Sequence, residues 1–249
     1  MRITGLGRII FGVSFAALGG LSLFVPGFVA EWGIVPRWMP AHEAVAMLAE
    51  VVLLAGGLAL LLPRLARPAA LVLAILLLLR LIALHAKPVA QHPLVELTWE
   101  ELSESLIFVA GGWTIVSLLP RQSGARAVPG NVHAGQILFA LALPAIGLSH
   151  FFYLKLTAPL IPSWLPFHVP LAYFTGAAWI AAALAILARV LARLAATLLA
   201  TMVSLFTLLV WIPMLIAAPA TLGNWAEFCV SAAITGAAWA VAESFGGRA

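Results

Sequence analysis

The feature that most constrains this chain is a series of eight long apolar segments, each of which is long enough to cross a lipid bilayer. A transmembrane helix needs about 20 consecutive apolar residues to span roughly 30 Å of hydrocarbon. The segments are continuous and lack the two-residue alternation of membrane β-barrels, so they predict an all-α membrane protein with eight transmembrane helices. They lie at residues 7–25, 43–63, 68–86, 102–119, 134–154, 169–188, 194–217 and 225–243.

The overall composition agrees with this prediction. Of the 249 residues, 64% are hydrophobic and only 9% are charged, whereas about a quarter of the residues of a soluble domain are charged. The basic residues are few and spread along the chain, so the pI near 10.0 does not indicate nucleic-acid binding. The single cysteine, Cys229, excludes an internal disulfide and a metal site built from several cysteines.

The positions of Lys and Arg predict the orientation in the membrane. With the N-terminus in the cytoplasm, Arg80 falls inside the third segment and the outer loops carry only Arg37, Lys87 and Lys155. Basic residues accumulate on the cytoplasmic side of membrane proteins, so both termini are predicted to be cytoplasmic, in a bacterial inner (plasma) membrane. The basic residues of the cytoplasmic segments are then Arg2, Arg8, Arg64, Arg67, Arg121, Arg126, Arg189, Arg193 and Arg248.

The chain also contains an internal repeat. A shift of 126 residues aligns Trp38 with Trp164, Pro40 with Pro166, His42 with His168, Arg67 with Arg193, Pro93 with Pro219, Trp99 with Trp225, Glu101 with Glu227 and Trp113 with Trp239. A shift of 128 aligns the first segment of each half, pairing Gly7 with Gly135, Phe11 with Phe139, Gly19 with Gly147 and Phe24 with Phe152.

This register predicts two four-helix units, residues 1–120 and 132–249, joined by a cytoplasmic linker at residues 121–131. Each unit has an even number of segments, so both insert the same way up. The prediction is therefore a pair of parallel repeats, related by an axis along the membrane normal.

The first unit carries the residues Gly7-Arg8-Ile9-Ile10-Phe11, Gly19-Gly20, Trp38-Met39-Pro40 and Gly56 to Arg64, and the second carries Gly135 to Phe139, Gly147 and Trp164-Leu165-Pro166. With these residues, nearly the whole chain resembles a tandem duplication of the four-helix unit of the DoxX-like family of integral membrane proteins. That family includes a small subunit of thiosulfate:quinone oxidoreductase and members associated with oxidative-stress partners. The resemblance implies a role beside a redox enzyme.

Two ionisable residues, Glu50 and Arg80, lie inside apolar segments of the first unit. A charge in hydrocarbon costs from about 2.5 kcal/mol upward, so both side chains are expected to face the bundle interior and each other. One outer-facing pocket is predicted to gather Glu50, Arg80, His42, His85, Glu101 and Glu104. The second unit retains only His168 and Glu227 of this set, so we expect it to act as a scaffold or half-wall.

Each of these residues also has a structural interpretation. Glu50 and Arg80 would form an ion pair that fixes the register of two helices. Trp38 and Trp164, in the repeated Trp-x-Pro-x-His motif, are typical of the interfacial aromatic belt. Glu101 and Glu227 would be first-turn residues favoured by the helix dipole. No two histidines have a helical ligand spacing, so no metal site is predicted.

The sequence contains no P-loop, dinucleotide fingerprint, GxSxG or HExxH motif, and its loops are too short for a soluble catalytic domain. We therefore predict a membrane subunit or quinone-facing partner of a redox system rather than an independent enzyme. A quinone is the candidate ligand, and a membrane or periplasmic redox protein is the candidate partner. If the chain takes part in catalysis, we expect it to be a quinone-linked oxidoreductase subunit.

Two alternatives remain open at this stage: a transporter of small molecules or lipids, and a scaffold or assembly factor for another membrane protein. Tandem parallel repeats suit transport. Against transport, Pro144 and Pro213 have no proline at the matching positions of the first half.

Overall fold

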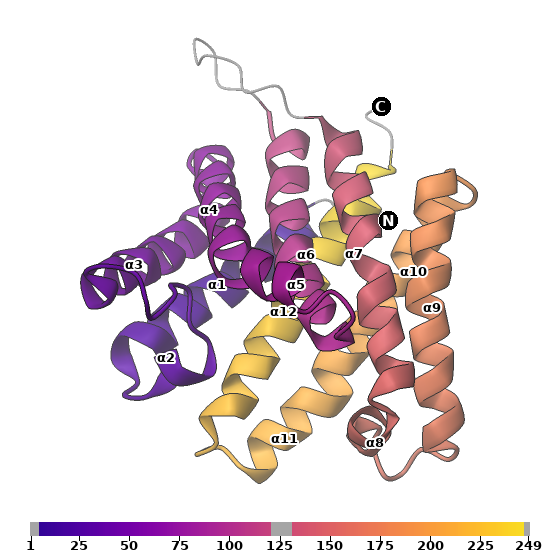
Figure 1. The fold of residues 1–249 in the computed structure, drawn as a ribbon. Coiled ribbons are helices and arrows are strands. Elements are labelled where there is room, and N and C mark those ends of the chain that lie inside the picture. The colour runs from indigo at the N-terminus through magenta and orange to yellow at the C-terminus, as the bar shows by residue number, and fades with distance from the viewer. Residues whose placement is uncertain (1–4, 121–130, 247–249) are drawn as a thin grey trace.

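The computed structural model describes residues 5–120 and 131–246, and every regular element in these ranges is a helix (Figure 1). Within these ranges, eight helical segments are long and apolar enough to cross a membrane. This confirms the prediction of an all-α fold with eight helices long and apolar enough to be membrane spans. The predicted linker lies outside the described residues except for Asn131.

The four spans of the first half are α1 (Leu6–Phe24), α3 (His42–Leu61), the segment Ala66–Gln91 and α6 (Glu96–Leu118). The third of these is composed of α4 (Ala66–Arg80), the π-helical η1 (Leu81–Ala86) and α5 (Lys87–Gln91). A short helix, α2 (Phe28–Glu31), lies in the loop between α1 and α3.

The four spans of the second half are α7 (Val132–Phe152), α9 (His168–Ala188), the segment Ala192–Ala217 and α12 (Leu222–Ser244). The segment Ala192–Ala217 consists of α10 (Ala192–Phe206), the π-helical η3 (Thr207–Trp211) and α11 (Ile212–Ala217). The short helices α8 (Leu154–Thr157) and η2 (Ala158–Leu160) follow α7, and α8 and α11 lie at the lower side of Figure 1.

The third and fourth spans are longer than the apolar pattern predicts. The pattern ends the third span at residue 86 and begins the fourth at residue 102, whereas α5 continues to Gln91 and α6 begins at Glu96. The short turn between them is held by side chains, because Thr98 Oγ1 donates to Val95 O at 2.8 Å and Trp99 Nε1 donates to Pro93 O at 3.0 Å. Polar residues continue a helix readily once it leaves the hydrocarbon, so hydropathy alone ends the third span too early and begins the fourth too late.

The π-helical segments η1 and η3 each end two residues before a proline, Pro88 and Pro213. Proline has no N–H to donate and its ring crowds the carbonyl four residues earlier. A π-helical turn is one way to insert an extra residue into a helix. The third and seventh spans therefore each change helical geometry near the loop that follows them.

The helices pack through close backbone contacts. α1 packs against α3 and α12, and α6 packs against α4, α7 and α12. A Cβ on Gly57 of α3 would lie 2.4 Å from Ala16 N of α1, and a Cβ on Gly236 of α12 would lie 2.5 Å from Phe11 N of α1. Such distances are possible only for glycine, which is how small residues let membrane helices approach one another. α6 and α12 are the most buried spans of the bundle.

Charged side chains cap helix ends on neighbouring helices. The Glu243 carboxylate of α12 accepts hydrogen bonds from Gly5 N and Gly7 N, both at 3.1 Å, at the start of α1. Arg67 Nη1 donates to Val116 O at 2.8 Å and to Leu119 O at 3.0 Å at the end of α6. An acid at a helix N-terminus and a base at a C-terminus both complement the helix dipole, so these contacts stabilise one end of the bundle.

Candidate functional site

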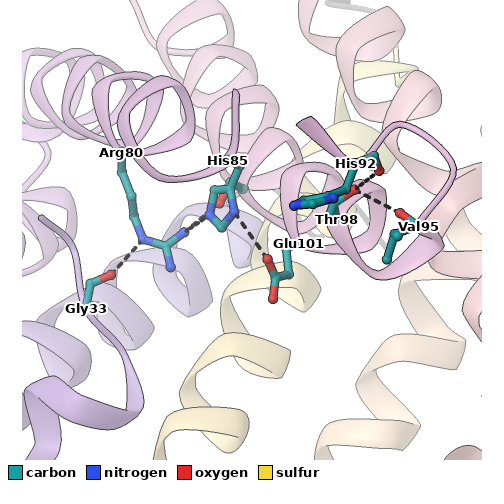
Figure 2. A network of polar contacts seen from close by, with 8 residues as sticks. Gly33, Arg80, His85, His92, Val95, Thr98 and Glu101 are labelled. Carbon is teal, nitrogen blue, oxygen red and sulfur yellow. Dashed lines mark hydrogen bonds and ion pairs between the residues drawn. The ribbon is translucent and has the colours of Figure 1, made fainter. Parts of the chain in front are cut away.

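Arg80 is the centre of a buried polar network (Figure 2). It is the last residue of α4 and is 8% exposed. Its Nε donates to Gly33 O at 3.3 Å, its Nη1 donates to Ser105 Oγ at 2.5 Å, and its guanidinium carbon lies 4.5 Å from the centre of the Trp32 ring. Its Nη2 makes no hydrogen bond with any residue that the structure describes, and Figure 2 shows this nitrogen without a contact. Nη2 therefore offers N–H donors that no described residue accepts.

His85 connects Arg80 to the more exposed Glu101. His85 Nε2 lies 3.3 Å from Arg80 Nη1, and its Nδ1 lies 3.8 Å from Glu101 Oε2 (Figure 2). A guanidinium can only donate, so Nε2 must be the acceptor and the ring proton is assigned to Nδ1, on the side of Glu101. The His85 ring is buried and the Glu101 side chain is 51% exposed. The three side chains form a continuous polar path from the interior towards the surface.

Further acidic side chains surround this path. The half-buried Glu104 interacts electrostatically with Arg80, Glu227, Glu100 and Glu101. In residues 5–120 and 131–246, however, no carboxylate forms an ion pair with Arg80. The positive charge is therefore solvated mainly by neutral groups, with carboxylates at longer range.

The expected contact between Glu50 and Arg80 is absent from the described residues, so this prediction is wrong. Glu50 is 5% exposed on α3, and its side chain has no hydrogen bond or ion pair with any described residue. Its backbone carbonyl faces α1, where a Cβ on Gly19 would lie 2.7 Å from it. Glu50 and Arg80 have similar depths in their spans, but depth does not fix the direction in which a side chain points around its helix axis.

The two histidines of the Trp-x-Pro-x-His motif close loops rather than joining the network. His42 Nδ1 lies 3.0 Å from Pro36 O, and His168 Nε2 lies 3.2 Å from Pro162 O. Each histidine follows a residue with positive φ, Ala41 at 53° and Phe167 at 62°. In both positions the ring ties the start of a span to the preceding loop, which favours the structural interpretation of the motif.

The tryptophans of the motif lie on the surface. Trp38 is 72% exposed and Trp164 is 67% exposed.

The structural interpretation of Glu101 and Glu227 as first-turn residues is wrong, because α6 begins at Glu96 and α12 at Leu222. Glu227 is exposed on α12 and interacts electrostatically with Glu100 of α6, so it faces the acidic side of the network.

Sequence reasoning missed Trp32 and Ser105, which contact Arg80 directly. It also missed a buried hydroxyl cluster in the second half, where Thr207 Oγ1 lies 2.8 Å from Ser231 Oγ and 3.1 Å from Thr235 Oγ1. Ser105 and Ser231 are 126 residues apart. The repeat register therefore holds the signal that identifies both serines, although a serine on an apolar helix is too common to stand out without its contacts.

The paired helix interruptions were missed for a related reason. Pro88 and Pro213 follow η1 and η3 but are 125 residues apart, so a strict shift of 126 does not align them. A tolerance of one residue would have identified the pair.

No group of three or more His, Cys, Asp and Glu side chains able to hold a metal ion is found among the described residues. The groups suited to holding a ligand are the free Arg80 Nη2 and the Trp32 ring beside it. An oxygen atom of a carbonyl or an anion is the matching acceptor, because arginine offers donors in a planar fork.

The sequence matches no model of a known protein family, and it shows no significant similarity to a curated protein or to a solved structure.

Proposed function

We propose that this integral membrane protein is a DoxX-like membrane subunit or partner of a redox system, in which Arg80 binds an oxygen atom of a quinone-like head group. The observation that carries the proposal is a guanidinium buried in a membrane span with an unused Nη2. A carbonyl or phenolate oxygen is the acceptor that matches the N–H groups of Nη2.

The neighbours of Arg80 suit a ring-shaped ligand. Trp32 offers a flat aromatic surface, and its contact with the guanidinium keeps the fork in one orientation. Aromatic walls with a few placed polar groups are typical of small-molecule sites. In the proposed complex Arg80 binds and orients the oxygen atom, and Trp32 contacts the ring plane.

The His85–Glu101 path supplies a route for protons in this proposal. His85 accepts from Arg80 through Nε2, so a proton arriving at Nε2 would place two donors against each other and separate the two side chains. Proton uptake at Nε2 is thereby coupled to the position of Arg80, and Nδ1 then releases its proton towards Glu101. Glu101, at the exposed end of the path, exchanges the proton with water.

The proposed architecture is two parallel four-helix repeats with both termini in the cytoplasm. Supporting it, α4 and α10 span Ala66–Arg80 and Ala192–Phe206, and α6 and α12 span Glu96–Leu118 and Leu222–Ser244, so each pair is offset by 126 residues. The contacts between halves are matched as well, since α12 packs on α1 and α6 packs on α7.

Native mass spectrometry of the protein in mild detergent tests the ligand site. We expect wild type to retain one quinone-like molecule per chain, Arg80→Gln to reduce its occupancy at least tenfold, and Glu50→Gln to retain it. Glu50→Gln is the matched control, since it also removes a charge buried in a span. Equal loss in both variants, or full occupancy in Arg80→Gln with an unchanged melting temperature, would rule out the site.

Transport is a second candidate, favoured by the interruptions η1 and η3 at related positions of the two halves. Paired broken helices in corresponding spans are typical of transporters with internal repeats. Flux of a labelled substrate into proteoliposomes tests it. A ligand-free protein that co-purifies in fixed ratio with one other chain would instead support the scaffold or assembly role.

A further inference from the structure

A groove of about 690 Å³ lies where α9 ends and α10 begins. Its lining includes Arg189, Leu191, Arg193, Leu194, Thr197 and Phe245. The turn between the helices is only three residues long, because α9 ends at Ala188 and α10 starts at Ala192. This turn places two arginines on one groove, at the start of α10.

The backbone of the turn is unusual. Arg189 has a φ of 57° and Leu191 has a φ of 50°, in the left-handed region that residues with a side chain rarely adopt. Such strain persists only where surrounding structure imposes it, and it clusters at binding sites. Here it keeps the turn short and directs both arginines to the same groove.

The two arginines differ in how they are held. Arg189 Nη2 lies 2.8 Å from His133 Nδ1, so α7 fixes the position of this guanidinium. The Arg193 side chain has no hydrogen bond or ion pair with the residues that the structure describes. Arg67, which is 126 residues earlier, instead caps the end of α6. Arg193 is therefore available to a ligand in a way that Arg67 is not.

The charges of the groove are not balanced by acids, since none of its described lining residues is acidic. Thr197 Oγ1 already donates to Arg193 O at 2.8 Å. The donors that the groove offers are thus guanidinium N–H groups, and the fitting ligand is an anion with several acceptor oxygens, such as a phosphate group.

The rim of the groove is apolar and exposed. Val190 is 62% exposed, Leu191 is 71% exposed and Leu194 is 53% exposed. A soluble phosphate would leave these side chains uncovered, whereas the acyl chains of a lipid would cover them. Basic pockets at the ends of membrane helices bind the head groups of anionic lipids.

We propose that this groove binds one anionic phospholipid, with Arg189 and Arg193 on its phosphate and the apolar rim against its acyl chains. The site is independent of the Arg80 network. It also distinguishes the two halves, because the arginine corresponding to Arg193 caps a helix in the first half.

The test is a titration of the delipidated protein with phosphatidylglycerol, followed by native mass spectrometry. The variants are Arg193→Gln and the double variant Arg189→Gln/Arg193→Gln. The matched control is Arg64→Gln, which removes the same charge from the corresponding turn between α3 and α4. One arginine near anionic lipid contributes about fivefold to binding, so we expect a loss of about 25-fold in the double variant, with the control close to wild type.

Three results would overturn the proposal. An equal loss in Arg64→Gln would show that the lipid is attracted only by general surface charge. Displacement of the lipid by millimolar inorganic phosphate would show a site for a soluble anion. Unchanged lipid affinity in the double variant, with an unchanged melting temperature, would show that the groove does not bind the head group.

Discussion

At the scale of single residues, the environment of Arg80 explains how a charge is kept inside a span. Its partners are a backbone carbonyl, a serine hydroxyl, an imidazole and an aromatic ring. A buried ion pair is strongly destabilised when one partner is lost, whereas neutral partners share the solvation of the charge. The residue types that solvate Arg80 are common in membrane helices, so their role is visible only from their positions.

Replacing Ser105 by alanine tests this description. Ser105→Ala removes the acceptor of a charged donor, so we expect it to lower the free energy of unfolding by about 1–3 kcal/mol. Ser103→Ala is the control, since Ser103 is also buried on α6 but has no hydrogen bond with Arg80. Denaturation in detergent, followed by circular dichroism, gives both values. Equal effects of the two substitutions would contradict a specific role for Ser105.

At the scale of elements, the helix contacts depend on particular glycines. The sequence shows 20 glycines but does not show which of them face a neighbouring backbone. Gly57 does, because its Cβ would lie 2.4 Å from Ala16 N and 2.5 Å from Gly12 O. Gly20 does not, because the nearest atom to its Cβ would be Leu54 Cδ1 at 3.9 Å.

The substitutions Gly57→Ala and Gly20→Ala are therefore expected to have opposite effects. Alanine is favoured over glycine in a helix by about 1 kcal/mol, and Gly20→Ala should keep or raise the melting temperature. Gly57→Ala forces α1 and α3 apart, and such overpacking typically costs about 1–3 kcal/mol. Thermal melts of both variants in the same detergent provide the comparison. A Gly57→Ala protein as stable as wild type would show that the helices can separate without cost.

At the scale of the whole molecule, the two halves are joined by extensive contacts between distant parts of the chain. α1 packs on α12, α6 packs on α7, and α6 and α12 pack on each other. Residues 1–120 and 132–249 expressed as separate chains are therefore expected to co-purify. Gly236→Leu should reduce this capture at least tenfold, because Gly236 lies against the backbone of Phe11. Two halves that purify separately would contradict the importance of this interface.

The orientation in the membrane is tested with single cysteines. The only native cysteine, Cys229, is buried, and Cys229→Ala provides the background. We expect a membrane-impermeant maleimide to label Leu94→Cys from the outside of intact cells, since Leu94 is 98% exposed. Arg64→Cys should be labelled only after the cells are opened. The reverse pattern would overturn the proposed cytoplasmic termini.

The sequence by itself determines the class of this protein and the number of its spans, because the length of an apolar run must match the thickness of a bilayer. It also places Arg80, His85 and Glu101 at related depths, since rise along a helix is fixed per residue. The direction of each side chain around its helix depends on how the helices pack. Only the tertiary structure therefore separates Glu50 from Arg80, assigns Ser105 and Trp32 to the guanidinium, and gives Arg67 and Arg193 different roles.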